Sequence, residues 1–331
     1  MIRDYKEKRL SERENALRIY SGKGEPEYIP TAVSCYKTVI PSGVRERPPW
    51  HEDGEDWFGV YWIWDEKTMG HTPDPRRPPV IENICEWDKS LRLPNLDEID
   101  WTSAAKADLE GYDRESSLLR LFLESGPFER LHSLVGFEEA LIAMYEEPEA
   151  FCGLMSKLTD FRVKLIEYLG SAYRPDVILN MDDLASASAP LFSMDMYRKF
   201  IKSYEKRIAD AIHAQGAYFL YHSCGRMQDF IDDLLEIGAD GLNALTPCND
   251  QKAVMEKYGS RFVVDGGLDS LLISGENTTE EELREEIRRA CDIFGPFKRY
   301  IIHPASFIPE HKKILLDEAV KYGHTFYKNI K

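Results

Sequence analysis

The second half of the chain alternates short apolar runs with longer segments in which apolar residues recur at helical spacing. Residues 177–181 form one such run, and residues 149–169 ahead of it have the helical pattern. The predicted strands of this half are 131–135, 177–181, 218–222, 241–245, 262–265 and 300–303. The predicted helices are 116–123, 137–145, 149–169, 194–215, 227–237, 251–258 and 280–294. Short strands that alternate with longer helices are typical of βα units and a parallel sheet.

The first part of the chain is less regular. Residues 1–21 predict a charged amphipathic helix, with Leu10, Leu17 and Tyr20 on its apolar face. Strands are predicted at 28–33 and 58–62. Residues 40–112 hold all six tryptophans and a proline-rich stretch near 73–79, which indicates a long excursion fixed by buried aromatic rings.

These strands number about eight, which favours a closed (β/α)8 TIM-type barrel of the α/β class. An open doubly wound sheet would carry a glycine-rich phosphate turn after its first strand, and the sequence has none. We expect a single domain over residues 1–331. Its first part, 1–112, contains the N-terminal helix, the early strands and the aromatic-rich insertion, and 113–331 contain the regular βα units.

The charge of the chain excludes several classes of partner. The formal net charge is −16, from 42 basic and 58 acidic residues. A nucleic-acid-binding protein needs a basic surface, and so does a protein that binds anionic membranes. The charged N-terminal sequence does not resemble a signal peptide, and no apolar run is long enough to span a membrane. The six cysteines are scattered, which is typical of reduced thiols, so a cytoplasmic location is expected.

Polar residues follow five of the predicted late strands, where the active site of such a barrel is built. They are Asp182 and Asp183, His222 with Cys224, Asn243, Asp265, and His303. Each alone has a structural explanation, since an aspartate after a strand is often a helix cap. Because the carboxyl ends of the strands meet at one rim, we expect these side chains to converge there.

His222 and Cys224 carry the most specific local signal. Residues two apart on a strand point to the same face, so an imidazole and a thiolate could bind one ion, and this pair suits zinc. The alternative is an inert buried cysteine beside a structural histidine. Trp57, Trp62 and Trp64 are either buried anchors of the insertion or the walls of a substrate pocket.

The same residues carry a resemblance to the uroporphyrinogen decarboxylase superfamily. The stretch 181–245, which begins MDDLASASAP and contains YHSCGR, resembles the core of that superfamily. KYGSRFVVDGGLDS and RYIIHPASFIP resemble its next two strand ends, and SERENALRIYSGKGEPEYIP, DWFGVYWIW and LPNLDEIDW resemble its divergent members. The resemblance implies a (β/α)8 barrel and one of two chemistries. One branch decarboxylates uroporphyrinogen, and the other moves methyl groups to or from corrinoid proteins.

The decarboxylase motif with its arginines is missing from TAVSCYKTVIPSGVRERPPW, where only Lys37, Arg45 and Arg47 are basic. The methyltransferase branch binds zinc through a His-x-Cys and a later cysteine. His222 and Cys224 match the first two ligands, but Ser306 in HPASFIP stands where the third is expected. The third ligand is therefore open, with His303 or Asp183 as candidates, and a site without metal is the alternative.

The resemblance implies a methyltransferase that moves a methyl group between a small molecule, such as a methoxylated aromatic (by O-demethylation) or a thiol, and a separate corrinoid-binding protein. The expected cofactors are the corrinoid of that partner and zinc. Uroporphyrinogen decarboxylase is the alternative activity, and a ligand-binding protein without catalysis is the third. We expect four catalytic residues: Asp182, Asp183, His222 and Asp265. The expected substrate-binding residues are Trp57, Trp62, Trp64, Tyr221, Asn243 and His303.

Overall fold

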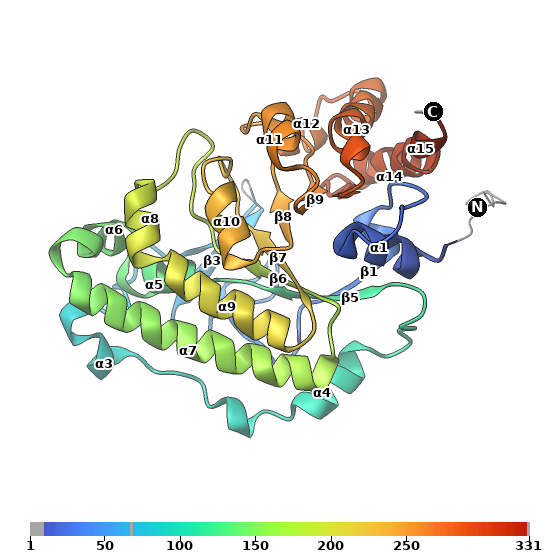
Figure 1. The fold of residues 1–331 in the computed structure, drawn as a ribbon. Helices are drawn as coiled ribbons and strands as arrows, with labels where there is room; N and C mark the ends of the chain where they lie inside the picture. Colours follow the sequence, from blue (N-terminus) through green and yellow to red (C-terminus); the bar gives the residue numbers. More distant parts are fainter. Residues whose placement is uncertain (1–9, 67–68, 330–331) are drawn as a thin grey trace.

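A computed structural model describes residues 10–66 and 69–329. Within these ranges, seven parallel strands form one curved sheet in the order β1-β5-β6-β7-β8-β9-β10 (Figure 1). The strands are β1 (Tyr36–Val39), β5 (Leu118–Leu123), β6 (Val177–Met181), β7 (Tyr218–His222), β8 (Gly241–Ala244), β9 (Val263–Gly266) and β10 (Tyr300–Ile301). The sheet with its surrounding helices confirms the predicted TIM-type α/β architecture.

The segment ahead of β1 joins the two ends of the sheet. Thr31 forms a parallel bridge with Ile302, directly after β10. The N–H of Ala32 donates to the carbonyl of Ile302 at 2.7 Å, and the N–H of Ile302 donates to Pro30 at 2.9 Å. The short helix α2 (Ala32–Cys35) then leads into β1, which pairs with β5. One stretch of chain thus contacts both edges of the sheet.

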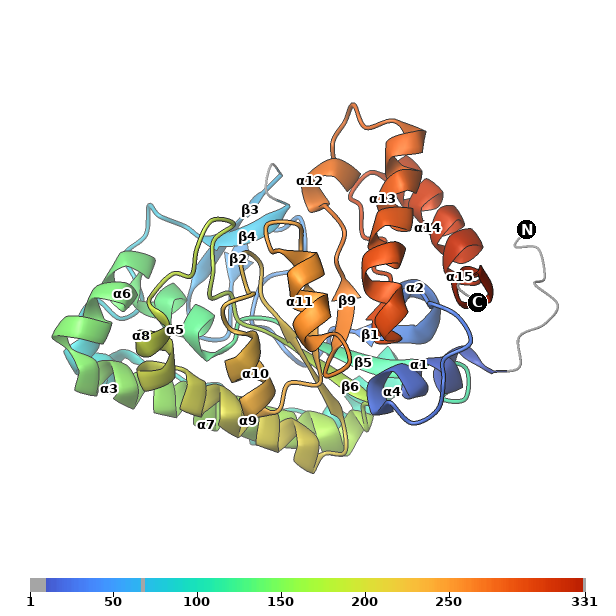
Figure 2. The same cartoon turned by 45° about the horizontal axis from the view of Figure 1, so that its top comes forward.

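Helices cover the outside of the sheet. Figures 1 and 2 show α7 (Pro148–Tyr173) and α9 (Lys202–Ala214) side by side along one part of it, while α13 (Glu280–Phe294) and α14 (Pro309–Gly323) lie close to α1 (Glu12–Ser21). The other helices are α5 (Pro127–Val135), α6 (Phe137–Glu146), α8 (Met194–Phe200), α10 (Ile231–Ile237), α11 (Gln251–Tyr258), α12 (Ser270–Ile273), η3 (Gly295–Phe297) and α15 (Phe326–Asn329). None of the described helices combines the length and the hydropathy that a membrane span requires.

Helix α1 packs against apolar residues inside the barrel. Its first turn is fixed by a capping box between Ser11 and Glu14. Ile19 and Tyr20 belong to a buried cluster with residues near the amino ends of the strands, such as Leu118. The Tyr20 hydroxyl also lies 2.7 Å from that of Tyr36 in β1. This packing fills the amino end of the barrel, which leaves the carboxyl end for a site.

The aromatic-rich insertion carries a separate antiparallel sheet of β2 (Gly54–Glu55), β3 (Tyr61–Asp65) and β4 (Gly70–Pro73). It continues through η1 (Ile84–Glu86), α3 (Trp87–Ser90), η2 (Leu96–Glu98) and α4 (Trp101–Asp108). Aromatic rings fix it to the barrel: Trp101 stacks on Tyr168 of α7 with ring centroids 6.0 Å apart, and Phe58 packs edge-on against Phe161 of the same helix at 5.2 Å.

Two predictions of secondary structure in the middle of the chain were wrong. Residues 116–123 contain β5 and not a helix, because this strand is buried on both faces and its apolar run has no alternation. Residues 131–135 end α5 and are not a strand. Pro127 starts that helix, and Asp182 accepts hydrogen bonds from its first amides.

The early elements also differ from the predictions. Residues 58–62 do not form a barrel strand, since only 61–62 lie in β3 of the small sheet. Residues 28–33 provide a single bridge, because Pro30 has no N–H to donate. The helix that was predicted over residues 1–21 begins at Glu12 in the structure, and residues 1–9 of the predicted range lie outside the described residues. The helix predicted at 194–215 is divided at Ile201, and the one predicted at 227–237 begins at Ile231.

Candidate active site

The carboxyl ends of four neighbouring strands bring the predicted polar residues together. His222 of β7 is in register with Asn243 of β8, and Asn243 is in register with Asp265 of β9. On the other side, His222 is in register with Met181, the residue ahead of Asp182 and Asp183. The strands therefore present these side chains in one row across the barrel mouth.

Asn243 fixes the orientation of His222. Its side-chain N–H2 donates to the carbonyl of Asp265 at 2.8 Å and to the Asp265 carboxylate at 3.1 Å. A carboxylate only accepts, so the amide oxygen of Asn243 must face His222, whose Nδ1 lies 2.5 Å away. Nδ1 of His222 thus carries the proton, and Nε2 keeps its lone pair for a ligand.

Asp265 is a fully buried anion. Its carboxylate lies 2.7 Å from Nη1 of Arg120 and 2.9 Å from Nδ1 of His303. Burial opposes ionisation, but the charges of Arg120 and His303 outweigh it and hold the pKa of Asp265 below its usual value. Asp265 is therefore an acceptor that anchors Asn243. Arg120 was not a candidate from the sequence, because it lies on β5, which was predicted as a helix.

Asp183, His222 and Cys224 form a group that could hold a metal ion, since their ligand atoms all lie within 4.8 Å of one another. Nε2 of His222 is 3.7 Å from Sγ of Cys224 and 4.0 Å from the Asp183 carboxylate. Tetrahedral zinc with ordinary bond lengths places nitrogen and sulfur ligands about 3.6 Å apart. The backbone N–H of Cys224 donates to Asp183 at 2.7 Å, which holds the carboxylate beside the thiol. The donor types and their spacing fit zinc.

The surroundings favour the uncharged forms of the two acidic members of this group. Burial raises the pKa of Asp183, and the charge of Glu129 adds to the effect. Desolvation likewise raises the pKa of the Cys224 thiol, with a further contribution from Asp183. A bound cation would reverse both effects, because it stabilises thiolate and carboxylate.

Four other candidate residues make contacts outside this group. Asp182 is buried and accepts the N–H groups of Phe128 and Glu129, so it caps α5. The other three interact as follows: the buried Tyr221 hydroxyl donates to Glu205 at 2.5 Å, His303 pairs with Asp265, and Ser306 donates to the Ile273 carbonyl at 2.7 Å. The structure thus brings Asp183, and neither His303 nor Ser306, to His222 and Cys224.

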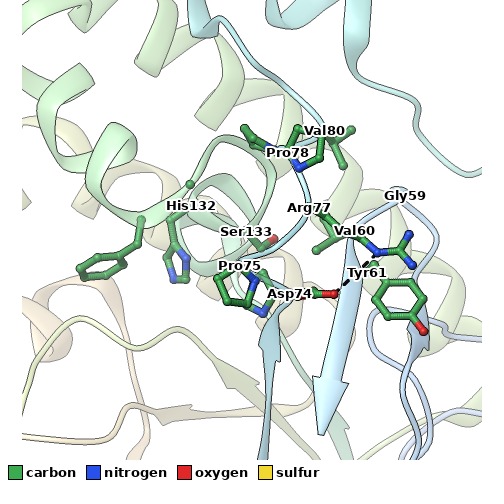
Figure 3. Close-up of a pocket in the computed structure, with 14 residues that line it drawn as sticks. Gly59, Val60, Tyr61, Asp74, Pro75, Arg77, Pro78, Val80, His132 and Ser133 are labelled. Atoms are coloured by element: carbon green, nitrogen blue, oxygen red, sulfur yellow. Dashed lines mark ion pairs between the residues drawn. The ribbon is translucent and has the colours of Figure 1, made fainter.

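The three candidate tryptophans pack against different neighbours. Trp57 packs edge-on against Phe161, and Trp62 is buried with its indole N–H donating to Asp56. Trp64 contacts His71, with ring centroids 5.0 Å apart. A cavity of about 720 Å³ lies between the small sheet and the junction of α5 and α6, and Figure 3 shows His132 and Arg77 among its lining residues. Neither these tryptophans nor the strand-end residues line it, so we do not assign the reaction to this cavity.

Two charged residues beside the group were not candidates from the sequence. Glu129, in the first turn of α5, is buried, and one carboxylate oxygen lies 3.0 Å from Nη2 of Arg47. Nε of Arg47 also donates to Ser125 at 3.1 Å. The charges of both residues act on Asp183, which places them next to the mouth. No local motif marks them, because Arg47 comes from the irregular insertion and meets Glu129 only in the folded chain.

Comparison with known proteins gives a family and a fold. A methyltransferase from Methanosarcina mazei has a similar structure, with a TM-score of 0.67 and 17% identity over 95% of this chain and 99% of that chain. A sugar phosphate isomerase/epimerase from Parabacteroides distasonis is much less similar, with a TM-score of 0.33 and 12% identity over 74% of this chain and 95% of that chain. Comparison with curated protein sequences gives no match. The family model for uroporphyrinogen decarboxylase (URO-D) matches residues 122–314, which are more than half of the sequence, and the chain belongs to this family.

Proposed function

We propose that this protein is a methyltransferase that moves a methyl group between a small molecule and a separate corrinoid protein. The observation that carries the proposal is the group of Asp183, His222 and Cys224 at the barrel mouth, with Nε2 of His222 directed at the other two. The fold shared with a methyltransferase supports it. The surroundings oppose the decarboxylase alternative, because Arg47, the arginine of the insertion whose charge acts on Asp183, is already paired with Glu129.

The chemistry of the group suits methyl transfer. When bound there, zinc supplies a Lewis acid beside the heteroatom that carries or receives the methyl group. Three protein ligands leave a fourth position for that heteroatom. Asn243 keeps His222 in the tautomer that can bind. Of the three acidic candidates, Asp265 is paired and Asp182 caps α5, so Asp183 is the carboxyl group that serves the reaction.

The mouth also has features of a docking surface for the partner protein. Three large apolar side chains are exposed on segments that follow strand carboxyl ends: Ile40 after β1, Leu271 in α12 after β9, and Phe307 after β10, with exposed fractions of 47%, 85% and 53%. Exposed apolar groups around a site are typical of protein interfaces. A corrinoid protein that covers the mouth would bury them and would bring its cofactor to the group.

The test is incubation of the protein with a reduced corrinoid protein and a panel of methyl donors, followed by the absorbance of the corrinoid. Methylation that requires both the protein and one donor class supports the proposal. A parallel incubation with uroporphyrinogen, analysed by chromatography, tests the alternative. Conversion to coproporphyrinogen without methylation in any arm would overturn the methyltransferase assignment. Donor binding without turnover would favour a ligand-binding protein instead.

A further inference from the structure

A cluster of buried and half-buried charges near the barrel mouth contains one carboxylate more than it has arginines. Three carboxylates each pair with one arginine: Asp56 with Arg130 at 2.5 Å, Glu46 with Arg162 at 2.9 Å, and Glu129 with Arg47 at 3.0 Å. The fourth carboxylate is Glu124, directly after β5. Its pKa responds to the charges of all three arginines, so it belongs to the same cluster.

Glu124 has no partner of its own within residues 10–66 and 69–329. Only its backbone carbonyl is used, as the acceptor for Nη2 of Arg162 at 2.5 Å. Burial raises the pKa of its carboxyl group, and the nearby Arg47 does not overcome this effect. With all seven groups ionised, the cluster carries one uncompensated negative charge, and burial also raises the pKa of Glu46 to about 7. A half-buried charge without a partner is costly, and either a proton or one bound monovalent cation would remove that cost.

The unpaired carboxylate lines a cavity of about 530 Å³ over the carboxyl ends of β1 and β5. Glu46 lines it as well, and its Oε2 atom is buried without a hydrogen-bond partner. The walls include two aromatic residues, Phe122 and the half-exposed Trp50. This volume lies in the range of sites for small organic ligands, and aromatic rings attract organic cations.

Among the other charged side chains of the cavity wall, only Arg47 is not exposed to solvent, and it is already paired. Arg47 pairs with Glu129, donates to Ser125, and lies 4.9 Å from the centre of the Trp62 ring. Its guanidinium therefore does not compensate Glu124. The remaining charges of the wall, Arg45, Asp53 and Glu55, belong to the insertion and lie toward solvent.

We propose that this cavity binds an organic monocation, specifically a quaternary ammonium compound, between the carboxylates of Glu124 and Glu46 and the rings of Trp50 and Phe122. Such a group has no N–H that would need an acceptor, and it is held by charge and by contact with aromatic rings. The inference concerns binding alone, so it stands whether or not the methyl-transfer proposal is correct.

The experiment compares choline with 3,3-dimethyl-1-butanol, its neutral carbon isostere, by calorimetric titration of the full chain. We expect choline to bind at least tenfold more tightly. Glu124→Gln should weaken choline binding at least tenfold. The matched control Glu55→Gln, which removes an exposed carboxylate from the same cavity, should change it less than twofold. Equal affinity for the two compounds, absence of choline binding, or equal effects of the two variants would overturn the proposal.

Thermal unfolding provides an independent readout. Glu124→Gln should raise the Tm of the free protein, because it removes an unpaired half-buried charge. Choline should raise the Tm of the parent protein and leave the Tm of this variant unchanged. Trp50→Ala changes a half-exposed side chain, so it should fold and bind choline severalfold more weakly. Unchanged binding by both variants contradicts the site. Displacement of choline by an equal concentration of potassium would show an inorganic cation site and overturn the ligand class.

Discussion

The side-chain oxygen of Asn243 lies 2.5 Å from Nδ1 of His222 on the neighbouring strand. This bond leaves Nε2 of the same ring facing Cys224 and Asp183. Asn243 therefore contacts one member of the group, His222, and determines which nitrogen of that ring faces Cys224 and Asp183.

Asn243→Leu should lower zinc affinity about 10–100-fold, the usual effect of losing a residue that orients a histidine ligand. Competition with a chelator measures this affinity, and nitrogen NMR of His222 reports its tautomer without metal. The control is Asn95→Leu in an exposed turn. Unchanged affinity together with an unchanged tautomer would show that Asn243 is only a packing residue.

Asp183→Asn should abolish activity and preserve the fold, since the amide oxygen can still accept the N–H of Cys224. Asp182→Asn should instead keep activity and lower the free energy of unfolding. Its new N–H2 would face the α5 amides and cost roughly 1–3 kcal/mol of stability. Chemical denaturation and turnover separate the two effects. If the Asp183 variant keeps activity within about tenfold, or ~1.4 kcal/mol of activation free energy, Asp183 has a structural role.

The pH dependence of stability should change in Glu205→Gln. Burial between Tyr197 and Tyr221 raises the pKa of Glu205 from 4.5 to about 7. Between these values the folded chain keeps the proton and the unfolded chain has lost it, so this contribution to the free energy of unfolding falls as pH rises. The total loss is on the order of 3 kcal/mol. Urea unfolding from pH 4.5 to 8 should show a flatter profile for the variant, and the exposed control Glu256→Gln should keep the original profile.

Arg120→Leu should destabilise the protein by about 3–5 kcal/mol, because it leaves the carboxylate of Asp265 buried without its main counter-charge. The double variant Arg120→Leu/Asp265→Asn removes both charges and should recover at least half of this loss. Denaturant unfolding of the single and double variants measures the difference. Equal stability of the two would indicate that lost packing, and not the unpaired charge, causes the effect.

Leu271→Glu and Phe307→Glu should each raise the KM for the corrinoid partner at least tenfold and leave kcat nearly unchanged. Both changes place a charge on the exposed apolar rim that we assign to docking. Ser171→Glu adds the same charge in the last turn of α7, near the amino end of the barrel, and should have no effect. Steady-state kinetics with varied partner concentration distinguishes docking from loss of turnover.

The sequence predicted the strand-end residues well because parallel strands align their carboxyl ends. His222, Asn243 and Asp265 each follow from a recognisable apolar run, and they lie in one row. The periodicity of apolar residues alone could not identify β5, because a strand that is buried on both faces does not alternate apolar and polar residues. That error also concealed Arg120 and Glu124, which lie on this strand and directly after it.

Contacts between distant segments were beyond the reach of the sequence. Asp183 joins His222 and Cys224 because of the path of the loop after β6, which brings the Asp183 carboxylate to the N–H of Cys224. The pair of Arg47 and Glu129 depends on how the insertion folds over α5. The residues of each pair are not separated by a characteristic number of positions, so no sequence motif predicts either contact.

The bridge between Thr31 and Ile302 also has a consequence for folding during synthesis. Thr31 leaves the ribosome 271 residues before Ile302, so the seam can form only after all the strands between them have been synthesised. Until then β1, β5 and the later strands present an unpaired edge, which other chains could extend. The two residues of the seam are 271 positions apart along the chain, and such a distant contact has a high loop-closure cost, so seam closure should be a late step in folding. Nascent chains that end before β10 should therefore bind chaperones more strongly than the 331-residue chain does.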